Sequence, residues 1–316
     1  MRSAPDTIAV VGAGSIGGSW VALALAHGLT VHAADPDPAA GGRLRAAVAD
    51  HLGDLAAGDG SAALDRLTVH TDPAAAAAHA DFVIEAGPER LDVKRALFAM
   101  LDEAVAPDVV LASSSSGFGP SAFQNACHHP ERVVVAHPFN PPHLVPLVEV
   151  VAGRHTSEET VEATMSIMTA LGRTPVRVRA ELPGHVVNRL QAALWREAYD
   201  LIGRGAISVA DLDRAVANGP GLRWALLGPI ATQHLSGGSG GLRHVLEHLG
   251  PPMVGWWADL GAPELTPKLA EQLVAGVRDE FGGRERDVLD RRDRALRELL
   301  AVKDRAGLGS AGEGWL

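Results

Sequence analysis

Short apolar runs alternate with longer stretches of helical periodicity through the first 180 or so residues of the chain. Runs that are apolar throughout are typical of parallel strands buried on both faces, and the helical stretches between them are typical of crossover connections. This alternation predicts an α/β fold with a doubly wound, Rossmann-type parallel sheet. The predicted strands are 8–11, 30–34, 67–69, 82–86, 109–112, 133–136, 147–151 and 175–178, and the helical stretches include 19–27, 90–104 and 158–171.

The pattern changes at residue 181. A proline and a glycine in Leu182-Pro183-Gly184-His185 interrupt the chain, and helical patterning with few strand signals follows. Its clearest helices are predicted over 186–203 and, as an amphipathic helix, over 284–305. We therefore predict a sheet domain over residues 1–182 and an all-α domain over residues 183–316, the second of which would serve substrate binding and dimerisation.

A glycine-rich turn follows the first predicted strand and precedes a helical stretch. In Gly12-Ala13-Gly14-Ser15-Ile16-Gly17, the first glycine suits a tight turn, the second a close approach of a pyrophosphate, and the third the packing of helix against strand. The helix N-terminus would add free N–H groups for the phosphates. The predicted cofactor contacts are Gly12, Gly14, Ser15, Ile16 and Gly17. A glycine-rich turn without a ligand is the alternative.

Asp35 ends the second predicted strand, at the position where dinucleotide-binding folds hold the adenosine ribose. Its carboxylate would accept hydrogen bonds from the ribose hydroxyls and would repel a 2′-phosphate. The sequence therefore favours NAD over NADP as the cofactor.

His137 follows the apolar run 133–136, at the carboxyl end of a predicted strand, where open α/β sheets bind their ligands. A proline-rich loop separates it from Glu149, which lies in the next apolar run. A buried carboxylate needs a partner, and an imidazole that acts as a general base needs a carboxylate to fix its tautomer. The two residues are thus a candidate base and its orienting acid. A solvated loop histidine and an edge-strand glutamate are the alternative.

Other polar residues follow strands of the sheet. Glu89 and Lys94 come after the strand 82–86 and either reach the cofactor or are a first-turn acid and a surface lysine. The run Ser113-Ser114-Ser115-Ser116-Gly117 is either a flexible polar loop or a source of hydroxyl contacts to cofactor and substrate.

The helical half contains fewer diagnostic residues. Asn188 lies in the first turn of the helix 186–203 and either caps it or points at substrate. Arg223 stands beside Trp224 in a glycine-rich turn, as a carboxylate clamp or as part of a surface turn. Trp256-Trp257 is expected in the core or in a dimer interface. His244 and His248 have helical spacing but lack a third ligand, so we predict no metal site.

Composition limits the partners. The chain has 316 residues, a net charge of −10 and a pI near 5.7, which argue against nucleic acid and anionic membranes and leave a small molecule as the expected ligand. No apolar stretch is long enough to span a bilayer, and the first strand begins too early for a signal peptide to precede it. The single cysteine, Cys127, fits a reducing cytoplasm.

Five motifs in register resemble the L-3-hydroxyacyl-CoA dehydrogenase superfamily as far as about Leu201: GAGSIG with Asp35, ADFVIEAGPERLDVKRALF, the serine run, HPFNPP…LVEVV and PGHVVNRL. The resemblance implies that His137 and Glu149 are the catalytic pair, with Ser116 and Asn188 as further catalytic and substrate-binding residues. It also implies cofactor contacts from Asp35, Glu89, Lys94 and Asn140, and a homodimer formed through the helical domain.

Two departures from the fatty-acyl members bear on the substrate. Those enzymes have Asn-Thr where this chain has Ser114-Ser115, and they carry a lysine-rich hairpin after the second strand. Here residues 36–66 contain five aspartates, three arginines and no lysine, which makes a poor cradle for a CoA phosphate. The motifs are more similar to the branch with L-gulonate 3-dehydrogenase, lambda-crystallin and carnitine 3-dehydrogenase, whose enzymes oxidise a 3-hydroxyl on a free carboxylic acid.

The resemblance therefore implies NAD-dependent oxidation of the secondary 3-hydroxyl of a small free hydroxy acid, of the L-gulonate or carnitine type, with Arg223 as a candidate ligand for its carboxylate. A dehydrogenase acting on 3-hydroxyacyl-CoA or acyl-carrier-protein thioesters is one alternative. A non-catalytic, crystallin-like NAD-binding protein is another, although the joint presence of Ser116, His137, Glu149 and Asn188 speaks against it.

Overall fold

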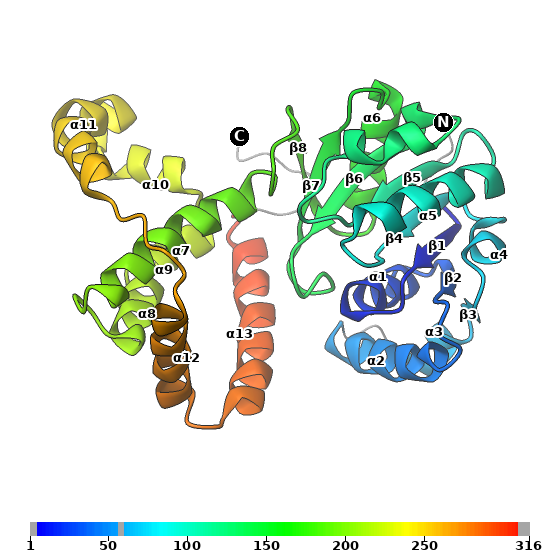
Figure 1. Cartoon of the computed structure of the whole chain (residues 1–316), viewed down its shortest axis with the longest axis horizontal. Helices are drawn as coiled ribbons and strands as arrows, with labels where there is room; N and C mark the ends of the chain where they lie inside the picture. Colours follow the sequence, from blue (N-terminus) through cyan, green and yellow to red (C-terminus); the bar gives the residue numbers. More distant parts are fainter. Residues whose placement is uncertain (1–4, 56–59, 309–316) are drawn as a thin grey trace. The chain divides into compact units, whose positions relative to one another are not determined.

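The computed structural model describes residues 5–55 and 60–308 (Figure 1). It divides into two compact units, Met1–Arg189 and Leu190–Leu316, which are described separately below. The division lies beyond the sequence-based boundary after residue 182. The backbone amides of Val186 and Val187 explain the difference, because they donate hydrogen bonds to Glu149 in the sheet and so attach this segment to the first unit.

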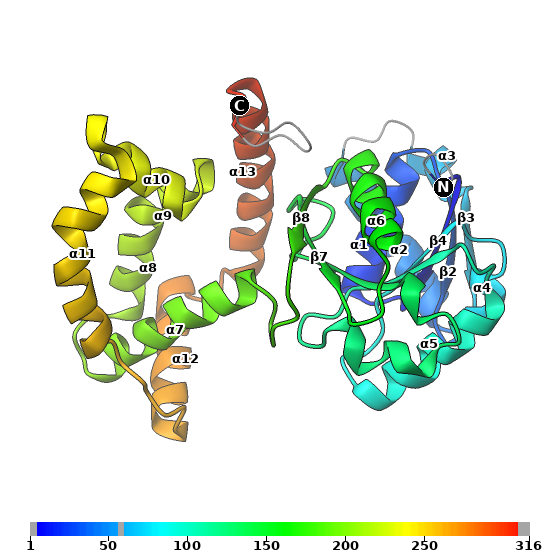
Figure 2. The ribbon, with the colours of Figure 1, turned by 90° about the horizontal axis from the view of Figure 1, so that it is seen from above.

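The first unit is built on one eight-stranded sheet in the order β3-β2-β1-β4-β5-β6-β7-β8, whose strands are all labelled in Figure 1 and seen from above in Figure 2. All eight strands predicted from the apolar runs are present. Their bounds are β1 Thr7–Val11, β2 Thr30–Ala34, β3 Leu67–His70, β4 Phe82–Glu85, β5 Val110–Ser113, β6 Val133–Pro138, β7 Leu147–Ala152 and β8 Thr174–Val178.

Helices cover both faces of this sheet, which explains why its central strands are largely apolar. Side chains of β1 alternate between two cores, with Ile8 and Val10 packed with residues of α1, α2 and α6, and Ala9 and Val11 packed with residues of α4 and α5. The bounds are α1 Ser15–Ala26, α2 Ala40–Asp54, α3 Gly60–Leu64, α4 Pro73–Ala77, α5 Leu91–Ala104 and α6 Glu158–Ala170, with 3₁₀ turns at Pro120–Ala122, Gln124–Ala126 and Pro130–Arg132.

The doubly wound, mostly parallel sheet is confirmed, and its last two strands reverse direction relative to the other six. β7 pairs antiparallel with β6, and β8 runs parallel to β7. The reason is the connection between β6 and β7, which covers only residues 139–146 and is too short for the crossover that a parallel neighbour needs. His137 consequently lies within β6, not just beyond its end.

Helix α1 begins at Ser15, earlier than the stretch 19–27 suggested. Gly17 and Gly18 in its first turn have low helix propensity, and this concealed the start of the helix in the sequence.

The second unit is helical, as predicted. Helix α7, Val187–Gly203, crosses the division between the units; the others are α8 Val209–Asn218, α9 Pro220–Leu226, α10 Pro229–Ser236, α11 Gly241–Asp259, α12 Pro267–Phe281 and α13 Glu285–Arg305, with a 3₁₀ turn at Gly238–Gly240. The segment with Arg223 is thus a short helix and not a turn, since Pro220 occupies a first-turn position where its missing N–H costs nothing.

Apolar side chains remain exposed on this helical unit. Trp256 and Trp257 are 62% and 63% exposed, so the prediction that they belong to a core is wrong and the interface alternative remains. Helix α13, predicted as amphipathic, buries none of its residues. Within the described residues, no helix is both long and apolar enough to cross a membrane.

Candidate active site

The glycine-rich turn between β1 and α1 has a separate steric reason for each of its glycines. A Cβ atom on Gly12, which has φ +110°, would lie 2.4 Å from the carbonyl oxygen of Ala86, and one on Gly17 would lie 1.8 Å from the carbonyl oxygen of Gly12. A Cβ on Gly14 would meet nothing within 4 Å. Packing therefore requires Gly12 and Gly17, whereas Gly14 opens onto the space that a pyrophosphate would need.

The surroundings of this turn also fit a dinucleotide. No side chain caps α1 at Gly14 and its first turn carries no acid, so the amides of Ser15 and Ile16 stand at a positive helix terminus. Asp35, directly after β2, accepts hydrogen bonds from the backbone amides of Ala13, at 3.0 Å, and Asp37, at 3.0 Å. Its carboxylate is thereby fixed next to the turn, on the side where an adenosine ribose belongs.

His137 and Glu149 meet across the antiparallel strands β6 and β7. They are direct partners in the ladder, and Nδ1 of His137 lies 3.0 Å from Oε2 of Glu149. Both side chains are buried, at 4% and 0% exposure. Because the carboxylate accepts a hydrogen bond from Nδ1–H, the lone pair of the neutral imidazole is on Nε2. The alternative of a solvated histidine and an edge glutamate is excluded by this burial.

The second oxygen of Glu149 is held by the loop that precedes α7. Its Oε1 accepts hydrogen bonds from the amides of Val186, at 2.9 Å, and Val187, at 3.0 Å. Burial by itself would raise the pKa of Glu149, but the hydrogen bonds from His137, Val187 and Val186 outweigh it and the pKa is lowered. The carboxylate is therefore charged at neutral pH, as the orientation of His137 requires.

Three of the four serines in the run are held by hydrogen bonds within the protein. Ser113 donates to Glu85 at 2.5 Å, Ser114 accepts from the indole of Trp20 at 3.1 Å, and Ser115 donates to Glu89 at 2.6 Å. Ser116 is exposed, and no hydrogen bond joins its hydroxyl to the rest of the described chain. The run is thus an ordered loop that presents one serine.

Asn188 is brought to this serine. Its Nδ2 atom donates to the backbone carbonyl of Ser116 at 3.3 Å, so the side chain joins the first turn of α7 to the serine loop. The two residues that the resemblance assigned to substrate therefore lie together in the first unit.

Lys94 is buried, so the alternative that it is a surface lysine is excluded. Its side chain is 2% exposed, and its ammonium lies 3.0 Å from both oxygens of Glu85 and 3.2 Å from Glu89. Glu89 in turn holds the serine loop through Ser115 and the amide of Gly117. The structure thus gives Lys94 a supporting position behind Glu89, and direct contact of Lys94 or Glu89 with the cofactor stays a prediction.

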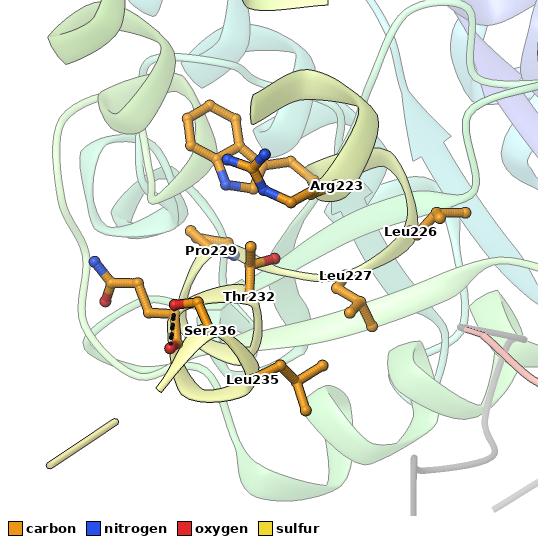
Figure 3. A pocket seen from close by; sticks show the side chains of 9 residues that line it. Arg223, Leu226, Leu227, Pro229, Thr232, Leu235 and Ser236 are labelled. Atoms are coloured by element: carbon orange, nitrogen blue, oxygen red, sulfur yellow. Dashed lines mark hydrogen bonds between the residues drawn. The ribbon is translucent and has the colours of Figure 1, made fainter. Parts of the chain in front are cut away.

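Two further predicted residues lie apart from this cluster. Asn140 is exposed on the loop between β6 and β7. Arg223 belongs to the second unit, where it lines a cavity of about 640 Å³ together with Trp224, Pro229 and other residues of α9 and α10 (Figure 3). Their roles toward cofactor and substrate remain predictions.

His185 is a buried neighbour of the pair that the sequence analysis did not single out. Its ring centroid lies 5.2 Å from that of His137, and its Nε2 donates to the carbonyl of Ser115 at 3.0 Å. Its Nδ1 is buried without a hydrogen-bond partner in the described part of the chain. Burial lowers its pKa, so the ring is neutral. In the sequence, the only indication that His185 lies near the site was its position in Pro183-Gly184-His185, just ahead of Asn188.

Comparison with known proteins agrees with this geometry. Residues 7–181 match the family model for the NAD binding domain of 3-hydroxyacyl-CoA dehydrogenase, and residues 184–280 match the model for its C-terminal domain. The chain belongs to the 3-hydroxyacyl-CoA dehydrogenase family. It is an NAD-dependent dehydrogenase, and the glycine turn with Asp35 is suited to hold the cofactor.

Relatives named L-carnitine dehydrogenase align with almost the whole chain. An L-carnitine dehydrogenase of Streptomyces coelicolor is 45% identical over 304 residues, covering 95% of this chain and 95% of that protein. One of Pseudomonas putida is 45% identical over 304 residues, covering 94% of each. A solved structure of the NAD⁺-dependent 5-formyl-3-hydroxy-2-methylpyridine 4-carboxylic acid 5-dehydrogenase superposes with a TM-score of 0.80 at 30% identity, covering 95% of this chain and 98% of that one.

Proposed function

We propose that this dehydrogenase oxidises the 3-hydroxyl of L-carnitine to the 3-oxo acid. The observation that carries the proposal is the buried His137–Glu149 pair in a chain that is 45% identical, over 95% of its length, to an L-carnitine dehydrogenase. Bound NAD would supply the acceptor for the hydride that leaves C3 of the substrate.

The residues of the chain handle the proton. His137 takes the hydroxyl proton at Nε2, because Nδ1 is already committed to Glu149. Glu149, fixed by two backbone amides, stabilises the imidazolium that forms. The hydroxyl of Ser116 and the amide of Asn188 would hold the substrate oxygen, and hydrogen-bond donors of this kind stabilise developing charge in the reverse direction.

The choice of a free acid over a thioester is supported by residues 36–66. This segment has five aspartates, three arginines and no lysine, and Arg43 is paired with Asp37 at 2.5 Å. The net charge of this segment is therefore negative, which is unfavourable for binding the phosphates of CoA. We assign the substrate carboxylate to Arg223, whose exposed guanidinium can bind a carboxylate in a bidentate manner.

A side-by-side assay tests the substrate. NADH formation is followed with L-carnitine, L-gulonate, 3-hydroxybutyrate and 3-hydroxybutyryl-CoA, each across a range of concentrations. The proposal expects kcat/KM to be highest for L-carnitine. A preference for the thioester would overturn the substrate, and NAD binding without turnover of any of the four would favour a non-catalytic NAD-binding protein. Arg223→Met should raise KM for L-carnitine with a smaller change in kcat.

We further propose a homodimer formed through the helical unit, in the cytoplasm. The exposed Trp256 and Trp257 and the unburied helix α13 support an interface. Light scattering during gel filtration should give twice the 32.9 kDa of one chain. A monomer would contradict the assembly without affecting the proposed reaction.

A further inference from the structure

Three metal-ligating side chains come together away from the catalytic pair. His51 and Asp54 lie in the last turn of α2, and His143 lies in the loop between β6 and β7. Over residues 5–55 and 60–308, they are the only group of three or more histidine, cysteine or acidic residues whose ligand atoms all lie within 4.8 Å of one another. Nothing in the proposed reaction uses them.

The three side chains of the group lie close together. The i, i+3 spacing of His51 and Asp54 places both on one face of α2. The rings of His51 and His143 are stacked, with centroids 4.0 Å apart and planes 26° apart, and Nε2 of His143 lies 3.6 Å from Oδ2 of Asp54. One ligand atom from each of two imidazoles and a carboxylate therefore lies within 4.8 Å of the other two.

A fourth residue orients His143. The His143 side chain is buried, and its Nδ1 lies 3.1 Å from the hydroxyl of Ser19 in α1. A hydrogen bond at the far nitrogen is the usual way in which proteins fix the tautomer and the direction of a metal-binding histidine. It leaves Nε2 of His143 directed toward Asp54.

We propose that His51, Asp54 and His143 bind a divalent transition-metal ion of the zinc class. Two nitrogen donors and one oxygen donor match the preferences of Zn²⁺, whereas Mg²⁺ and Ca²⁺ prefer oxygen ligands alone. Bonds of about 2.0–2.2 Å in a tetrahedral site place ligand atoms about 3.3–3.6 Å apart. His143 and Asp54 already meet this distance, at 3.6 Å, whereas atoms up to 4.8 Å apart must approach by up to about 1.5 Å as the stacked histidine rings turn toward the ion. The partly exposed Asp54, at the end of its helix, is also free to move.

The bound ion would join parts of the cofactor domain that are distant in sequence. It would tie α2 to the loop that follows His137 and carries Asn140, and through Ser19 it would reach the helix after the glycine-rich turn. The site is therefore structural: it would order the loop between β6 and β7 without touching the reacting atoms.

Zinc titration of the full-length protein tests the site. After removal of metal with a chelator, Zn²⁺ is titrated in competition with a chromophoric zinc indicator. We compare the wild type with His51→Asn and Asp54→Asn, which alter partly exposed positions and should preserve the fold. The double variant His244→Asn with His248→Asn is the matched control, because these rings on α11 are also 4.0 Å apart but lack a third ligand.

The expected result is one zinc ion per chain in the wild type and in the α11 variant, with affinity reduced on the order of tenfold or more in His51→Asn and in Asp54→Asn. Mg²⁺ should not compete. Ser19→Ala should also weaken binding, and zinc should slow hydrogen exchange in residues 139–146. No zinc binding by the wild type, or affinity that only the α11 variant reduces, would overturn the proposal. Neither result would bear on carnitine oxidation.

Discussion

His137 and Glu149 are direct cross-strand partners in the antiparallel ladder of β6 and β7, and their side chains meet at 3.0 Å. Directly opposed residues of an antiparallel pair project on the same face of the sheet. The reversal of chain direction at residues 139–146 thus creates the contact. Had β7 been joined by a crossover, the two residues would not have been paired in this ladder.

The steric roles of the glycines in the β1–α1 turn can be separated by mutation. Gly17→Ala places a Cβ against the Gly12 carbonyl oxygen, so we expect a loss of about 1–3 kcal/mol in the free energy of unfolding, as for other overpacked sites. In Gly14→Ala the new Cβ meets no atom within 4 Å, so the free energy of unfolding should change by at most about 1 kcal/mol. The affinity of this variant for NADH should fall, because the Cβ occupies the space that the pyrophosphate needs. Urea unfolding and NADH fluorescence titration measure the two effects.

Gly18→Ala is the control for the first of these effects. A Cβ there meets only Leu44 Cδ1, at 3.7 Å, and alanine is a better helix former by up to about 1 kcal/mol. If Gly17→Ala proved as stable as Gly18→Ala, the steric explanation of the motif would be wrong.

Lys94→Met should destabilise the protein strongly. The substitution leaves the buried carboxylate of Glu85 without its cation, and breaking a buried pair costs about 3–5 kcal/mol. Arg43→Met removes an exposed partner of Asp37 and should cost no more than about 1 kcal/mol. Urea unfolding of both variants gives the comparison, and similar losses would show that the burial of Lys94 has no energetic consequence.

His185 should make the protein less stable in mild acid. Burial lowers its pKa from 6.5, so the unfolded chain binds a proton in a pH range where the folded protein does not. Stability therefore falls as the pH decreases through 6.5 toward the lower pKa of the folded state. His185→Asn removes this contribution, and asparagine tolerates the φ of +52° at this position.

Urea unfolding at about pH 7.5 and about pH 5.5 provides the check, since this range spans the ordinary titration of histidine. The variant should lose less stability between the two pH values than the wild type. Equal losses would mean that His185 is protonated as readily in the folded protein as in the unfolded chain.

The apolar runs were sufficient to predict the eight strands, because the central strands β1, β4, β5, β6 and β7 are buried by helices on both faces and even the partly exposed edge strands β3 and β8 keep apolar residues. The glycine-rich turn and Asp35 could also be identified from the sequence, because their motif lies within one short segment of the chain. A buried carboxylate in the run 147–151 led to His137 by chemical argument, and the structure contains that contact.

The remaining features depend on long-range contacts that leave no local signal. Lys94 looks like a surface lysine until the fold places Glu85 and Glu89 around it. Four of the eight strands lie between Asp54 and His143 in the sequence, and only the packing of the β6–β7 loop near α2 brings the two residues together. The exposed tryptophans of α11 could not be distinguished from core residues by hydrophobicity alone.

Turnover of L-carnitine by Glu149→Gln, measured together with NAD affinity, tests the central claim most directly. The glutamine amide cannot hold the proton at Nδ1 of His137 as the carboxylate does, so we predict a fall in kcat on the order of 10²-fold with the Kd for NAD unchanged. His137→Asn should lose at least as much activity. Unchanged kcat in Glu149→Gln, or a loss explained entirely by weaker NAD binding, would contradict the assignment of this pair as the base and its orienting acid.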